Sequence, residues 1–120
     1  MARANWILHK GKKILRIDFS NTDENGVLAA IAAAKPIISR EPEKSILCLV
    51  DTTGTKVTKG ISSAMKEFTL HNKPFMKMTA VTGLDGLQKV VLTLVIVVTN
   101  RKNLIAKNTK EEAMDWLISQ

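Results

Sequence analysis

Hydrophobic and polar residues alternate in different ways along the chain, and the first patterns predict strands. Two short runs at residues 6–9 and 14–19 flank the turn signal Lys10-Gly11, and apolar side chains alternate with polar ones in the second run. A period of two is typical of a strand with one buried face, so these runs predict an opening β-hairpin. Residues 45–50 are continuously apolar instead, which favours a central strand covered on both faces.

Helical spacing next to capping residues predicts three amphipathic helices. Apolar residues recur every three to four positions after residues 21–24, through residues 58–72, and after a capping box that opens at Thr109. Pro36 is expected to kink or end the first helix, because proline lacks the N–H that would bond to the carbonyl one turn earlier. The isoleucines at residues 37–38 nevertheless favour one further helical turn.

The remaining apolar segments are shorter or less regular. Residues 75–81, bounded by proline and glycine, predict another strand, and residues 103–107 predict a short one. Residues 90–98 have high β-propensity, which favours a strand. Asp85 and Gln88, however, form a capping-box-like start, and the segment is longer than most strands. We therefore predict a buried helix here.

The resulting order of elements, β-β-α-β-α-β-α-β-α, defines the expected fold class. Short parallel crossovers are right-handed and lay their helices against the sheet, so this order predicts an α/β protein with a mixed sheet and helices packed on it. The length of 120 residues suits one domain over residues 1–120. The composition, 45% hydrophobic and 24% charged, is that of an ordinary globular protein.

Segments that direct a protein out of the cytoplasm are not expected. His9 and the lysines that follow it stand where a secretory signal would need an uninterrupted apolar stretch. Residues 90–98 are far shorter than the roughly 20 apolar residues that a spanning helix needs. We expect a cytoplasmic protein without a membrane span.

The lone Cys48 lies in an apolar run, which favours a small buried side chain over a nucleophile.

Charge and chemistry-bearing residues narrow the expected function. The net charge of +7 raises nucleic-acid binding as a third functional hypothesis, but lysine and arginine are scattered over almost every segment, which makes it the least favoured of the three. His9 and His71 with one cysteine do not make a metal-binding set. No nucleophile, base and orienting group can be assembled, and we expect no catalytic residue, no metal and no cofactor.

Several motifs spread over nearly the whole chain resemble a known family. They are LVDTTG at 49–54, AMKEF at 64–68, HNKPF at 71–75, AVTG at 80–83, GLQK at 86–89 and TKEEAMDWL at 109–117. Together they look like small bacterial proteins described as STAS/SEC14-domain or SpoIIAA-like. The resemblance implies a STAS-like fold, as in anti-sigma factor antagonists, and a non-enzymatic regulatory module. Its implied partner is an unidentified protein or a second copy of the chain.

The resemblance also singles out the stretch Asp51-Thr52-Thr53-Gly54, called the 51–54 loop below. In anti-sigma factor antagonists the matching stretch resembles Asp-Ser-Ser-Gly, and a partner kinase phosphorylates the second hydroxyl residue. By that resemblance Thr53 is the implied phosphate acceptor. The full candidate set for this anion-binding loop is Asp51, Thr52, Thr53, Gly54, Lys56 and Lys59.

Two interpretations of the 51–54 loop are open from the residues alone. Open α/β sheets place ligands at the exit of central strands, and a phosphate on Thr53 could meet Lys56, Lys59 and the free N–H groups of the following helix. Alternatively, Asp51 and the two threonines cap backbone groups in a strand-to-helix turn, as short polar residues commonly do.

A second hypothesis is a carrier or sensor of a small apolar or lipid-like ligand. It follows from the Sec14-like relationship and from the apolar segment 90–98. The candidate lining residues are Met65, Phe68, Met76, Met78, Val91 and Val95. Their alternative role is an ordinary core with methionines filling gaps, and we expect the large apolar side chains to fill a core of this size.

Overall fold

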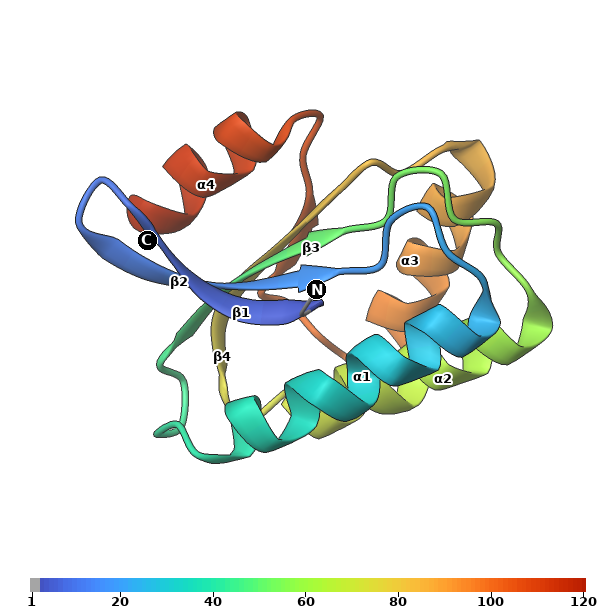
Figure 1. Cartoon of the computed structure of the whole chain (residues 1–120), viewed down its shortest axis with the longest axis horizontal. Helices are drawn as coiled ribbons and strands as arrows, with labels where there is room; N and C mark the ends of the chain where they lie inside the picture. The colour runs from blue at the N-terminus through green and yellow to red at the C-terminus, as the bar shows by residue number, and fades with distance from the viewer. Residues whose placement is uncertain (1–2) are drawn as a thin grey trace.

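The order of strands and helices expected from the sequence is the order in the computed structural model, which describes residues 3–120. The elements are β1 (Ala4–His9), β2 (Lys12–Asp18), α1 (Glu24–Ser39), β3 (Ile46–Asp51), α2 (Lys59–Asn72), β4 (Met76–Thr82), α3 (Gly86–Thr99), β5 (Leu104–Ala106) and α4 (Lys110–Ile118). The predicted α/β fold class is confirmed (Figure 1).

The strands form one mixed sheet whose spatial order, β1-β2-β3-β4-β5, is their order in the chain. The β1–β2 pair is antiparallel, and every later pair is parallel. Lys10 and Gly11 connect the hairpin with φ angles of 51° and 84°, as the two central positions of a type I′ turn require. All six residues of β3 are buried, which explains the continuous apolar run at this place in the sequence.

Helices cover both faces of the sheet, but unequally. Parallel strands that succeed one another in one direction put their crossover helices on the same face. Accordingly α1, α2 and α3 lie on one face and α4 on the other (Figure 1). The larger core lies under α1 and α2, whereas the smaller one consists of Ile14, Leu47, Leu49, Ala80, Ala113 and Leu117.

Pro36 does not end the first helix, contrary to one of the two sequence expectations. Helix α1 continues through Pro36 to Ser39, so the further helical turn is confirmed. Ala32, whose carbonyl loses its partner to the proline, is exposed, as is Pro36 itself, so water can reach this side of the helix. Ile38 is fully buried and holds the last turn against the core.

Residues 86–99 form the predicted helix α3, but the prediction that it is buried is wrong. Its capping box is present, with Asp85 and Gln88 each bonding the other's backbone. The exposed large apolar side chains of this helix are Leu87, Val90, Leu94, Val97 and Val98. When apolar residues occur on every side of a helix, their spacing does not show which side is buried. In the structure α3 packs chiefly against α2, and its other side is left exposed. Within residues 3–120, neither α3 nor another helix has the length and apolar character needed to cross a membrane.

Candidate functional site

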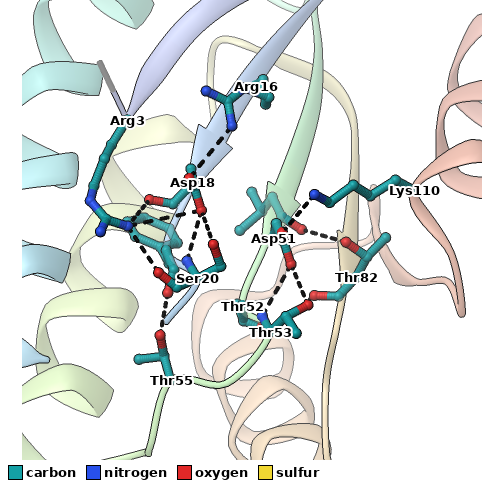
Figure 2. Close-up of polar contacts among 12 residues, drawn as sticks. Arg3, Arg16, Asp18, Ser20, Asp51, Thr52, Thr53, Thr55, Thr82 and Lys110 are labelled. Carbon is teal, nitrogen blue, oxygen red and sulfur yellow. Dashed lines mark hydrogen bonds and ion pairs between the residues drawn. The ribbon is translucent and has the colours of Figure 1, made fainter. Parts of the chain in front are cut away.

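The 51–54 loop leaves the central strand β3 between the ends of β2 and β4. The backbone N–H of Thr53 donates to the Asp51 carboxylate at 3.0 Å, and the Thr53 hydroxyl donates to the same oxygen at 2.6 Å (Figure 2). The Thr52 hydroxyl donates to the carbonyl of Thr82 at 3.0 Å. Gly54 has a φ of 75°, which suits glycine at the point where the chain turns away. The structure therefore brings Asp51, Thr52 and Thr53 together as a closed turn.

Lys110, the first residue of α4, forms an ion pair with the carboxylate of the 51–54 loop. Its ammonium lies 3.1 Å from the second carboxylate oxygen of Asp51, whose side chain is only 7% exposed. Burial by itself raises the pKa of Asp51, but the hydrogen bonds from Thr53 and Lys110 outweigh burial and hold the pKa below its ordinary value. The sequence did not predict Lys110, because its contact with β3 exists only once α4 has crossed the sheet.

The Asp51 carboxylate should make stability depend on pH at acidic values. A carboxyl with a lowered pKa stabilises the fold above its unfolded-state pKa of about 3.9, and this contribution is lost as the pH falls further. We expect Asp51→Asn to lower the free energy of unfolding at pH 7 by about 1 to 2 kcal/mol. Urea denaturation at pH 7 and pH 3 should show the difference from wild type shrinking at pH 3. An equal difference at both values would contradict a role for the charge, and Glu43→Gln, at an exposed position, is the control.

A second turn of the same design lies beside the first and was missed in the sequence. At the end of β2, the N–H and hydroxyl of Ser20 donate to the Asp18 carboxylate at 2.8 and 2.5 Å (Figure 2). The two turns are joined by the N–H of Asn21, which donates to the carbonyl of Thr53 at 2.8 Å. Asn21 also has a positive φ of 48°, like Gly54 at the matching position. The repeated pattern of aspartate, any residue and a hydroxyl residue was the available signal.

Lys56 and Lys59 lie after the 51–54 loop, and their role in binding an anion stays a prediction. Helix α2 begins at Lys59 with Thr58 as its N-cap, so residues 55–58 separate the 51–54 loop from the helix. Both lysines are exposed, and among residues 3–120 the ion pair to Asp51 comes from Lys110 instead. The loop therefore does not lead directly into a helix N-terminus.

A cavity of about 100 Å³ lies between the sheet and helices α2 and α3. The apolar side chains of the larger core therefore leave some space between the sheet and these helices. Of the predicted lining residues, the cavity includes Met65, Phe68, Met76, Val91 and Val95.

Met78 is the exception, because it packs in the smaller core on the opposite face of the sheet. The reason is an irregularity in the β3–β4 ladder: Ile46 pairs with Met76, but the next residue, Leu47, pairs with Met78. The extra residue, Lys77, shifts the alternation of β4, so residues two apart no longer share a face. Period-two alternation in the sequence cannot reveal such a bulge.

Gln88 connects the cavity with the 51–54 loop. Its side-chain amide donates to the carbonyl of Thr52 at 3.2 Å and also to the carbonyl of Thr55. Gln88 is 6% exposed, lines the cavity and caps the first turn of α3. One side chain therefore bonds the backbone of the 51–54 loop, caps the start of α3 and forms part of the cavity wall.

Comparison with known proteins identifies the fold. The chain is similar to the crystal structure of an uncharacterized protein of the DUF3478 family with a SpoIIAA-like fold from Shewanella loihica PV-4. The TM-score is 0.73 at 15% sequence identity, over 95% of this chain and 91% of that one. No family model matches the chain, and no curated protein matches it. The chain has a SpoIIAA-like fold, as the resemblance implied.

Proposed function

We propose that this protein is a non-enzymatic regulatory or protein-interaction module whose signalling surface is the 51–54 loop. The observation that carries the proposal is the position of Thr53. Its side chain is exposed at the exit of the central strand, and its hydroxyl donates to Asp51 at 2.6 Å. A phosphate on that oxygen places a dianion beside the Asp51 carboxylate, so modification changes the charge and shape that a protein partner meets.

The charges around Thr53 suit a switch that alters binding more than stability. A phosphate adds about −1.5 to −2 charges beside the Asp51 carboxylate. Lys110 is close enough to Asp51 to be shared with the new anion. Repulsion from Asp51 and attraction to an exposed ammonium act in opposite directions, and exposed ion pairs contribute at most about 1 kcal/mol each. The charge and shape offered to the partner change far more.

Thr53→Glu should therefore fold normally and lose an interaction that Thr53→Ala retains. The measurement is a pull-down from the native host with wild type and both variants, together with thermal melts and mass spectrometry of cell-derived protein for phosphate on Thr53. Ser63→Glu, which adds the same charge at an exposed hydroxyl residue of α2, is the matched control. If all variants capture the same proteins equally and Thr53 carries no phosphate, the 51–54 loop is only a turn.

The cavity favours a second candidate function, a carrier or sensor of a small apolar ligand. Its wall combines apolar side chains with a few polar ones, which is the usual composition of a small-molecule site. Through Gln88, an occupant would also contact the side chain that bonds the backbone of the 51–54 loop. This second candidate does not require phosphorylation of Thr53.

A further inference from the structure

Arg101 is a buried cation in the wall of the cavity. It follows Asn100, the left-handed residue that ends α3, and leads toward β5. The residue is 3% exposed and lines the cavity together with Cys48, Thr69 and Thr79. Arginine is among the residue types least often fully buried without an ionic partner, so its position calls for an explanation.

The partners of the Arg101 guanidinium in the structure are all neutral. Its Nε donates to the side-chain oxygen of Asn103 at 2.9 Å, one terminal nitrogen donates to the carbonyl of Thr69 at 3.3 Å, and the other donates to the Thr79 hydroxyl at 3.1 Å. A guanidinium has five N–H donors, so these three bonds leave two for another acceptor. Among residues 3–120, no carboxylate forms an ion pair with Arg101.

An unpaired buried charge is unfavourable unless something neutralises it. Burial lowers the pKa of Arg101 from its ordinary value, yet arginine keeps its proton at neutral pH because that value is so high. Buried charges in proteins are therefore paired or bound to a counter-ion. By contrast, the half-buried Arg16 has Asp18 within 3.6 Å. The cavity beside Arg101 provides the space for an anion that the chain itself does not supply.

We propose that the cavity binds a small carboxylate whose anionic group pairs with Arg101 and whose apolar tail lies among residues such as Phe68, Met65 and Val95. Guanidinium and carboxylate match in a two-bond geometry, which uses the two remaining donors. An engineered apolar cavity of about 150 Å³ holds benzene, so a cavity of about 100 Å³ suits a short tail with fewer carbon atoms than the six of benzene. This inference deepens the second candidate function by naming the ligand class.

The test compares hexanoate with hexan-1-ol, which has the same number of carbon atoms and no charge. Titration of the wild-type protein, followed by calorimetry and by NMR of the cavity residues and the Arg101 side chain, should show hexanoate binding one-to-one. A charge-assisted hydrogen bond contributes about 1.5 to 3 kcal/mol, so hexanoate should bind at least about tenfold more tightly than hexan-1-ol. This comparison needs no substitution and does not depend on whether a variant folds.

Two variants then assign the effect to Arg101. Arg101→Met should reduce hexanoate affinity at least about tenfold and leave hexan-1-ol affinity within about threefold, whereas Lys102→Met, the exposed neighbour with the same charge loss, should change neither. Equal affinity for both compounds, or no binding of either at millimolar concentration, would overturn the proposal. Neither result bears on the Thr53 pull-down, so failure of the ligand site and failure of the regulatory function are distinguishable.

Discussion

Gly83→Ala is expected to lower the free energy of unfolding by about 2 to 4 kcal/mol. Gly83 follows β4 with a φ of 79°, a backbone conformation that residues with a Cβ rarely adopt. An added Cβ would lie 2.6 Å from the backbone nitrogen and 2.8 Å from the Cα of Thr53. Backbone atoms cannot rotate away as a flexible side chain can, so the 51–54 loop would have to move as a unit. Urea denaturation monitored by circular dichroism measures the loss.

Gly86→Ala is the matched control for this prediction. Gly86 is the first residue of α3, and an added Cβ there meets no heavy atom within 4 Å. Alanine should leave stability unchanged or raise it by up to about 1 kcal/mol, because glycine carries an entropic cost in helices. A loss for Gly83→Ala no larger than that for Gly86→Ala would show that the loop does not need the close approach to β4.

Leu117→Ala is expected to destabilise the protein by about 2 to 5 kcal/mol. Leu117 is 0% exposed in the smaller core, where α4 packs against Leu49 and Ala80 of the sheet. Truncation leaves a void that neighbouring strands cannot close, since they are hydrogen-bonded to one another. The weakened α4 also carries Lys110, so crystallography or NMR of the variant should show a looser pair between Lys110 and Asp51. Thermal and urea unfolding measure the stability change.

Leu87→Ala makes the same chemical change on a helix but at an exposed position. Leu87 in α3 is 60% exposed, so its truncation removes little buried surface and should change stability by about 0.5 kcal/mol at most. A large loss at Leu87 would mean that another surface covers α3 in solution. Both variants replace leucine by alanine in a helix, so the change in helix propensity is the same. The difference between them therefore measures the packing under α4.

Local features of the fold were predictable because the residues that determine them are adjacent in sequence. The N-caps Thr58, Asp85 and Thr109 each accept a backbone N–H three residues later, and the sequence showed these residue types at the right spacing. The continuous apolar run of β3 likewise predicted a strand buried on both faces, and all six of its residues are buried. Fold class followed from the order of these elements, which needs no knowledge of long-range contacts.

Features that depend on distant segments could not be derived in the same way. Lys110 reaches Asp51 only through the position of α4, and the inward direction of Arg101 has no local signature among so many scattered lysines and arginines. The bulge at Lys77 redirected Met78, and the sidedness of α3 depends on its packing on α2. For the candidate site, the sequence therefore supplied the turn and five of the residues that line the cavity, but not Lys110 and Arg101, the cations that give the two places their chemistry.

The division of the core into two unequal parts has a consequence for synthesis of the chain. Strands pair with their neighbours in sequence, so the sheet and its first three helices can assemble as a nascent chain emerges from the ribosome. The face formed by Ile14, Leu49 and Ala80 is covered by α4, whose anchoring residue is Leu117. Until α4 has emerged, a nearly complete sheet therefore exposes these apolar side chains to water, and its smaller core forms only when α4 packs.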